Sequence, residues 1–294
     1  MTNASPCVGT CKLDPETGWC LGCARTGDEI AGWGSRTQAA RAAIWAALPD
    51  RFAQLGVACR RLPWDTDEIR DFVICSLRDV TGTWVTGVVG AVAEFTAPPG
   101  SRTRVSRDGQ DIVAVTDGGA LRFAIDDDVR ALTFDPPETP PERQRILLAV
   151  TRERRRPPAA STVSALGQDT GAIDAEARQA HLFDLGLGRK EARFCLRCDP
   201  GAARDALASV CGTRPDEALP RIGATLVARS PTRVVESALG RIEVATPIPS
   251  PGSSSPAGPH THLLPDHLAT GRALPAGMDL PRAYLPGALF HPAR

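Results

Sequence analysis

The sequence predicts an α+β protein: a small four-cysteine module with two short helices, a β-rich antiparallel meander or barrel, an α+β unit and an irregular proline-rich tail. Three observations support this prediction. Four of the cysteines fall within residues 7–23, which contain little apolar material to pack. Short β-rich runs separated by turn signals fill residues 71–155, and helix-start patterns occur on both sides of them. The predicted segments are 1–55, 56–158, 159–246 and 247–294.

Composition excludes several classes of protein. The 294 residues are 42% hydrophobic and 23% charged, and the formal net charge is zero, so the totals indicate neither a disordered chain nor one built to bind a polyanion. The chain contains no run of 18 apolar residues, and its start, MTNASPC, lacks the basic and apolar regions of a secretory signal. We therefore expect a cytoplasmic protein, with no membrane partner, whose nine cysteines stay reduced.

The strongest signal is the cysteine spacing CxxxC, eight residues, CxxC. Four sulfur ligands on a short, turn-rich chain suit tetrahedral Zn²⁺ or an iron-sulfur cluster, because such a segment has little else to fold around. The alternatives are four unrelated small apolar residues or two disulfides. Because protein can fill all four coordination positions, the pattern favours a structural or electron-transfer centre over a catalytic Lewis acid. The expected ligands are Cys7, Cys11, Cys20 and Cys23.

Two helices should follow the cysteines. Thr26 with Glu29, and Ser35 with Gln38, each have the form of a capping box at a helix start. The second helix should end before Pro49, because the residue that precedes a proline disfavours helical geometry. Its apolar residues share one side at helical spacing: Ala40, Ile44, Trp45 and Leu48.

Residues 5–51 resemble a small bacterial family called domain of unknown function 1289, whose members are described as predicted Fe-S proteins. The resemblance rests on the opening SPC, on Asp14 and Gly18 of the connecting loop, on the stretch CxGCxRTxxEIxxW and on a final LPxR. It implies that the four cysteines named above are the ligands of the cluster. Chemistry alone leaves Zn²⁺ open.

The middle of the chain reads as strands. From Asp71 to about Arg155 the β-rich runs are FVICSL, TWVTGVVGAVAEF, DIVAVT, ALRFAI, VRALTF and RILLAVT. Residues 70–155 faintly resemble bacterial haem-utilisation carrier proteins, through GAVAEF, GGALRFAIDDDVRALTF and RILLAV. That resemblance implies haem handling, but residues 56–170 contain no histidine that could ligate haem.

A second CxxC pair lies in the predicted strand RFCLRC. Side chains three residues apart on a strand point to opposite faces, so Cys198 should lie with Phe194 and Leu196 while Cys195 faces the other way. We therefore predict that this pair is inert, although a redox or metal role is the alternative. A helix after Asp199, a helix near residues 216–229 and a strand at RIEVAT complete the unit. Three lone cysteines are expected to pack in the core: Cys59, Cys75 and Cys211.

Histidines collect near the C-terminus. An extended GPHTHLLPDHL would place His260 and His262 on one face, with His267 nearby, and these imidazoles could ligate a metal or haem, act as acid and base, or cap turns in a polar tail. A site is possible there only if the tail, from about residue 256, packs on the body.

The sequence therefore predicts a metal-binding protein of unassigned biochemical role, with an iron-sulfur cluster or Zn²⁺. One alternative is a haem- or iron-handling protein or redox enzyme that uses the C-terminal histidines; another is a protein-docking module with a structural zinc knuckle. None of the motifs GxSxG, HExxH, GxGxxG or GxxxxGK[ST] occurs, so an enzyme is not favoured. The expected partner is a protein or redox partner, because the module's four arginines and intervening acidic residues do not make a nucleic-acid surface.

Overall fold

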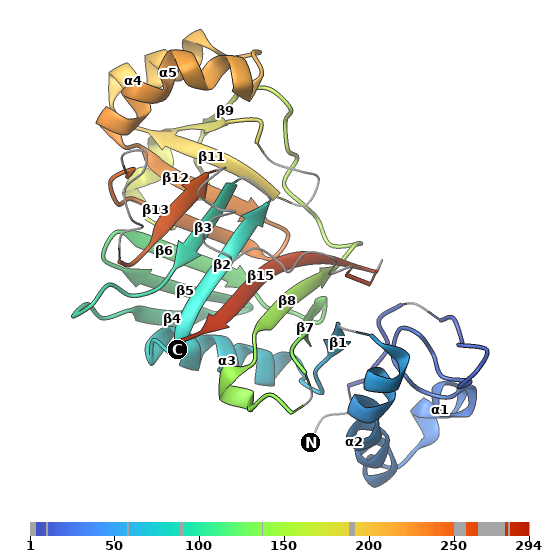
Figure 1. The fold of residues 1–294 in the computed structure, drawn as a ribbon. Helices are drawn as coiled ribbons and strands as arrows, with labels where there is room; N and C mark the ends of the chain where they lie inside the picture. Colours follow the sequence, from blue (N-terminus) through green and yellow to red (C-terminus); the bar gives the residue numbers. More distant parts are fainter. Residues whose placement is uncertain are drawn as a thin grey trace.

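The chain folds into two antiparallel sheets with a helical N-terminal module at one side (Figure 1). Side chains from both sheets meet in one hydrophobic core, which confirms the α+β class. Across the described strands, each sheet is open at both ends, so neither closes into a barrel. In this computed structural model the described residues are 4–9, 11–57, 59–88, 91–136, 138–187, 192–249, 257–263, 280–281 and 283–293.

The first predicted helix is present as α1 (Gly27–Ala31). The Thr26 hydroxyl accepts a hydrogen bond from the Glu29 backbone N–H (3.1 Å), and the Glu29 carboxylate accepts one from the Thr26 N–H (2.9 Å). This is the predicted capping box. A short 3₁₀ turn, η1 (Trp33–Ser35), follows it.

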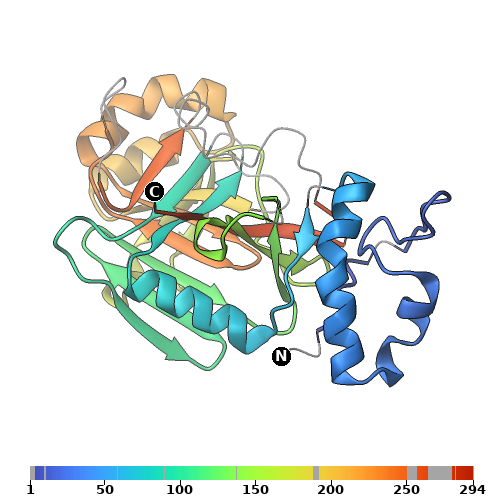
Figure 2. The ribbon, with the colours of Figure 1, turned by 60° about the horizontal axis from the view of Figure 1, so that its bottom comes forward.

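The second helix, α2 (Gln38–Leu55), differs from the prediction at both ends. Its N-cap is Thr37 rather than Ser35, and it continues through Pro49 instead of ending there. A proline within a helix removes one hydrogen bond. Continuation, however, carries Phe52 into a small buried cluster with Ile44 and Leu48, and this apolar contact outweighs the local preference. Figure 2 shows α2 running beside β1.

The run FVICSL was expected to be a strand, and the structure corrects this: it lies in the helix α3 (Thr66–Arg78). Asp65 and Glu68 form a capping box at its start. Ile69, Val73 and Leu77 follow at intervals of four residues, so that one side of the helix enters the core. A β-rich composition concealed this helical spacing.

The seven-stranded sheet places the C-terminal segment at its centre. The C-terminal strand runs between β8 and β2 and pairs antiparallel with both, and the short strand at residues 260–263 pairs with β3 at the edge. The expectation of an irregular tail is therefore corrected for residues 284–292: the apolar run YLPGALF supplies a strand that is buried on both faces, and a register shift between Pro286 and Ala288 accommodates the proline. The strands in spatial order are β1 (Arg60–Arg61), β7 (Val129–Thr133), β8 (Ile146–Thr151), β15 (Tyr284–Pro292), β2 (Gly82–Val88), β3 (Ala91–Phe95) and β14 (His260–Leu263).

The eight-stranded sheet runs across the predicted boundary at residue 158. The pairing of β6 with β13 joins strands from the segments 56–158 and 159–246, so these two segments share one sheet. The strands in spatial order are β4 (Arg104–Asp108), β5 (Asp111–Thr116), β6 (Gly119–Ala124), β13 (Gly240–Val244), β12 (Thr232–Ser237), β11 (Ala192–Cys198), β10 (His181–Asp184) and β9 (Ser164–Gln168). Two 3₁₀ turns lie in the connections: η2 (Pro141–Arg143) and η3 (Glu176–Gln179).

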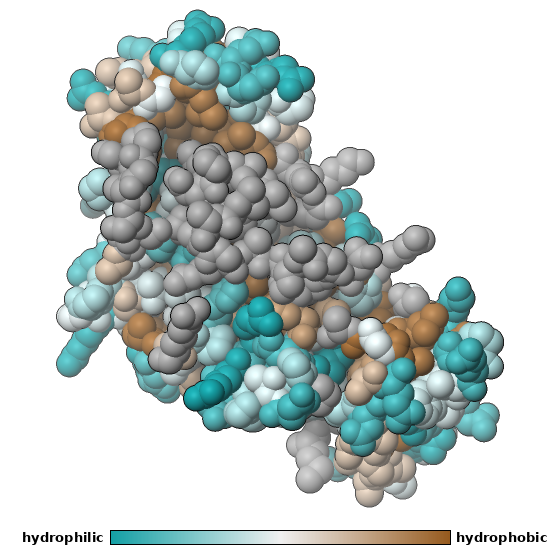
Figure 3. All heavy atoms as spheres, in the orientation of Figure 1, coloured by the Kyte–Doolittle hydropathy of each residue, from teal (hydrophilic) through white to brown (hydrophobic). Residues whose placement is uncertain are grey.

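Two helices, α4 (Gly201–Ser209) and α5 (Pro215–Arg229), close one end of the core. In Figure 3 they carry hydrophilic residues outward at the top of the molecule, with hydrophobic residues directly beneath. Between the sheets, Trp84 and Phe123 stack edge to face with ring centroids 5.5 Å apart, and the Trp84 indole N–H donates to the Ser76 hydroxyl (3.0 Å). None of the described helices combines the length and the apolar character of a membrane span.

Candidate metal centre

The loop between the two cysteine pairs folds back on itself. Asp14 stabilises the turn, because its carboxylate accepts hydrogen bonds from the backbone N–H and the hydroxyl of Thr17, both at 2.8 Å. These hydrogen bonds lower the pKa of Asp14. Gly18 adopts a φ of +71°, which favours glycine. The reversal pairs Leu13 with Cys20 in an antiparallel bridge and so brings Cys11 and Cys20 to the same end of the loop.

The CxxC pair forms a tight turn. The backbone N–H groups of Cys23 and Ala24 both donate to the Cys20 carbonyl, at 3.2 and 2.7 Å. Ala24 completes the turn with a φ of +56°, an uncommon conformation for a residue with a Cβ atom, and is fully buried. Cys20 and Cys23 are also buried, whereas Cys7 is half-buried and Cys11 is exposed.

The thiols of the two cysteine pairs influence one another electrostatically. Cys7 is the main cause of the raised pKa of the Cys11 thiol, and burial and Cys20 raise it further, as expected where thiols are near one another. The Cys7 sulfur accepts a hydrogen bond from the Gly9 N–H (3.4 Å). All nine cysteines are free thiols. Over the described ranges, no three His, Cys, Asp or Glu side chains already stand close enough together to hold a metal ion.

Arg25 is a candidate site residue that the sequence did not reveal, since there it counted only as one of four surface arginines. Its side chain is buried against the cysteines, its Nε donates to the Cys23 sulfur (3.4 Å), and its guanidinium lies 4.8 Å from the centre of the Trp33 ring. Within the described part of the chain, it forms no ion pair with a carboxylate, and its buried Nη1 has no hydrogen-bond acceptor. Burial raises the pKa of the Cys23 thiol, although the hydrogen bond from Arg25 opposes this.

The first cysteine also contacts the two-sheet body. The Cys7 carbonyl accepts hydrogen bonds from Arg61 Nη1 (3.4 Å) and from the Tyr284 hydroxyl (3.3 Å). Burial, together with the nearby Arg130, lowers the pKa of Arg61 to about 10. Burial likewise raises the pKa of Tyr284. Val8, next in the chain, packs in a buried cluster with body residues: Cys59, Leu132, Leu147, Ala149, Tyr284 and Leu289.

The helices hold the other side of the cysteine loop. Arg51 on α2 forms an ion pair with Glu29 on α1 (2.6 Å) and donates to the carbonyl of Ala24 (3.1 Å), inside the CxxC turn. The Trp45 indole N–H donates to the Ala4 carbonyl (3.1 Å). α2 therefore holds the CxxC turn through Ala24 and the segment before Cys7 through Ala4.

Of the three predicted histidine ligands near the C-terminus, the structure describes the side chain of His260 only. His260 on β14 is buried; its Nε2 lies 3.7 Å from the Glu94 carboxylate, and its Nδ1 lies 2.7 Å from the Gly258 carbonyl. His262 pairs with Val92 in the backbone register of β14, and its side chain lies outside the described residues, as does the whole of His267. β14 pairs with β3 of the seven-stranded sheet, and the same segment also contacts the α+β unit, where Arg233 Nε donates to the Thr261 hydroxyl (3.3 Å) and the Thr246 hydroxyl donates to the Pro259 carbonyl (2.9 Å).

The two cysteines of the second CxxC pair lie on opposite faces of β11. Cys198 packs in the main core with Phe194 and Leu196, whereas Cys195 lies in a separate cluster on the other face of β11, as predicted from the strand alternation. Burial raises the pKa of Cys198 to about 12 and that of Cys195 well above its ordinary value.

Cys59 is also buried, as expected, and burial raises its pKa to about 11. The expectation of core packing was wrong for Cys75 and Cys211, which are both exposed. Cys75 lies on the side of α3 that faces away from the core, and Cys211 follows the end of α4.

Comparisons with known proteins match two parts of the chain. A family model described as Protein of unknown function (DUF1289) matches residues 5–52, which confirms the N-terminal resemblance. A second, described as Family of unknown function (DUF6925), matches residues 68–294, which is more than half of the chain. The resemblance of residues 70–155 to haem-utilisation carrier proteins is not shown. No curated protein and no solved structure matches the chain.

Proposed function

The chain belongs to the family of unknown function DUF6925, and we propose that its N-terminal module holds a metal centre, an iron-sulfur cluster or Zn²⁺, on four thiolates. The ligands would be Cys7, Cys11, Cys20 and Cys23, and the centre would supply either a structural cross-link or a one-electron carrier. The donor set fits both metals, because soft sulfur ligands suit each of them.

The observation that supports this proposal best is the environment of Arg25. A buried guanidinium without a carboxylate is costly, so it needs another negative charge nearby. The adjacent Cys23 cannot supply that charge as a free thiol, because burial favours its neutral form. A bound metal deprotonates its cysteine ligands, and four thiolates around a divalent ion carry a net negative charge. Arg25 would then donate to a charged sulfur and stabilise the loaded centre.

A structural role is supported by the contacts of Cys7. The residue would be a ligand through its sulfur, while its carbonyl is held by Arg61 and Tyr284 of the body. Loading the centre would therefore fix the module against the sheet that contains β15. Electron transfer is the second candidate function, favoured by the exposure of Cys11 and of the neighbouring Leu13, which is 49% exposed and would offer a redox partner an apolar edge.

The test is metal analysis and an optical spectrum of full-length protein purified without oxygen. We expect one centre per chain: broad visible absorption for an iron-sulfur cluster, or a colourless protein with one equivalent of zinc. Cys20→Ser should abolish binding, whereas Cys211→Ser, which removes an exposed thiol outside the module, should leave it unchanged. Substoichiometric metal in the wild type, or equal metal in the two variants, would refute the proposal. A zinc protein would exclude the electron-transfer role.

A further inference from the structure

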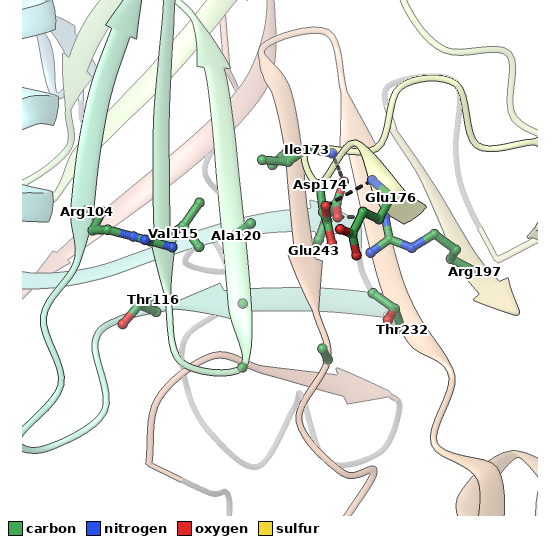
Figure 4. Close-up of a pocket in the computed structure, with 13 residues that line it drawn as sticks. Arg104, Val115, Thr116, Ala120, Ile173, Asp174, Glu176, Arg197, Thr232 and Glu243 are labelled. Atoms are coloured by element: carbon green, nitrogen blue, oxygen red, sulfur yellow. Dashed lines mark hydrogen bonds and ion pairs between the residues drawn. The ribbon is translucent and has the colours of Figure 1, made fainter. Parts of the chain in front are cut away.

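A second candidate site lies outside the N-terminal module, on the outer face of the eight-stranded sheet. It is an open pocket of about 580 Å³, a volume typical of pockets that bind small molecules. Figure 4 shows its two walls, with Arg104, Val115 and Ala120 on one side and the acidic residues on the other. The full lining consists of Arg104, Val115, Thr116, Gly118, Gly119, Ala120, Ile173, Asp174, Glu176, Arg197, Thr232, Glu243 and Ala245.

Arg197 lines this pocket and is held in place by two ion pairs. Its side chain is only 8% exposed and is held from one end, because Nη1 donates to Asp169 (3.2 Å) and to Glu243 (2.7 Å). Arg241 contacts the same two carboxylates, through hydrogen bonds of 2.7 and 3.0 Å to Asp169 and an ion pair of 2.9 Å with Glu243. The guanidinium is therefore fixed in orientation before any ligand arrives.

The other edge of Arg197 is left open. Its Nε and Nη2 atoms make no hydrogen bond with any residue in the described ranges, yet the residue lines the pocket. These two nitrogens form the planar fork that binds a carboxylate in a bidentate manner. A buried and oriented fork with two unused donors has the geometry that a carboxylate requires.

The rim supplies charges of both signs. Arg104, exposed on β4, faces the pocket from one wall without an ion-pair partner among the described carboxylates. Asp174 and Glu176 contribute two exposed carboxylates from the opposite wall, where the Asp174 carboxylate accepts a hydrogen bond from the Glu176 N–H (3.1 Å). Arg197 and Arg241 are neutralised by Asp169 and Glu243. The three remaining charges, one positive and two negative, leave the pocket with one net negative charge.

We propose that this pocket binds a free amino acid whose carboxylate lies against the Arg197 fork, with Arg104 facing it across the pocket, and whose ammonium group lies against Asp174 and Glu176. The excess of one carboxylate favours a ligand with a second amine, so a basic amino acid such as lysine fits best. A dicarboxylate would leave the acidic wall facing a like charge, and a simple diamine would leave the Arg197 fork unused. Nothing in this proposal depends on the metal centre.

The experiment is isothermal titration calorimetry of the full-length protein with L-lysine and two fragments of it: 1,5-diaminopentane, which lacks the carboxylate, and hexanoate, which lacks both amines. We expect L-lysine to bind at least tenfold more tightly than either fragment, since 1,5-diaminopentane cannot bind the Arg197 fork and hexanoate cannot bind the two carboxylates. Arg104→Gln and Glu176→Gln should each weaken L-lysine by about tenfold, the scale of one such hydrogen bond.

Arg102→Gln is the matched control, because Arg102 is an exposed residue that precedes β4 and does not line the pocket. Its affinity for L-lysine should equal that of the wild type. Arg197→Lys, which keeps the charge but removes the fork, should abolish binding, and its melting temperature shows whether it is folded. Absence of L-lysine binding by the wild type, affinity for either fragment equal to that for lysine, or equal affinity in Arg104→Gln and Arg102→Gln would each overturn the proposal.

Discussion

The Tyr284 hydroxyl lies 3.3 Å from the backbone carbonyl of Cys7 and donates a hydrogen bond to it. Tyr284 begins the C-terminal strand β15, and Cys7 is the first of the four proposed metal ligands, so the two ends of the chain meet at the base of the cysteine loop. This hydrogen bond joins the cysteine loop of the N-terminal module to β15, the central strand of the seven-stranded sheet. It leads to the first prediction.

Tyr284→Phe should lower the free energy of unfolding by about 1 kcal/mol, because the substitution removes one hydrogen bond and keeps the ring. We also expect the variant to release its metal to a chelator faster than the wild type, since the Cys7 loop loses one of its two anchors on the body. Chemical denaturation and a colorimetric chelator assay measure the two effects. An unchanged release rate would show that this contact is independent of the metal centre.

Arg25→Gln should weaken metal binding by about 10- to 100-fold, the range observed when a group that supports a metal ligand is removed. Arg25→Lys keeps the charge and should recover part of the affinity. Competition with a metal indicator gives the affinities. Lys12→Gln removes an exposed positive charge beside Cys11 in the sequence and should have little effect; a loss as large as that of Arg25→Gln would mean that general electrostatics, not the Arg25 contact, determines binding.

Gly9→Ala should destabilise the protein more than Gly18→Ala. Both glycines have left-handed backbone, with φ of +76° and +71°, so each substitution costs about 1 kcal/mol in backbone strain. A Cβ at Gly9 would in addition lie 2.6 Å from the Cβ of Ala283, whereas a Cβ at Gly18 meets nothing within 4 Å. The extra overpacking should cost a further 1–3 kcal/mol or so, and thermal melts of the two variants compare them directly. Equal losses of stability in the two variants would contradict the close contact between Gly9 and Ala283.

Alkylation of the native protein should label Cys75 and Cys211 and spare Cys195 and Cys198. Alkylation requires the thiolate, and a pKa raised by burial lowers the thiolate fraction at any pH below it. With its pKa raised to about 12, Cys198 would be ionised in only about one molecule in ten thousand at pH 8. Raising the pH toward 12 should therefore increase the labelling of Cys198. Mass spectrometry of the digested protein locates the label, and prompt labelling of Cys198 at pH 8 would contradict its burial.

The sequence by itself determined the features that depend on local spacing. The cysteines of the N-terminal module, the capping box at Thr26 and the alternating strand that sends Cys195 and Cys198 to opposite faces all follow from residues within a few positions of each other. Such patterns need no knowledge of distant chain, because capping and strand alternation are properties of a short stretch of backbone.

The tertiary structure decided what depends on distant partners. β-rich FVICSL became helix because Ile69, Val73 and Leu77 find a common core, and α2 passes Pro49 because Phe52 has a cluster to join. The proline-rich tail became the strand β15 because β8 and β2, more than a hundred residues away, offer it hydrogen bonds on both edges. Arg25 and the open fork of Arg197 could not be recognised in the sequence, because their burial and their missing partners exist only once the chain has folded around them.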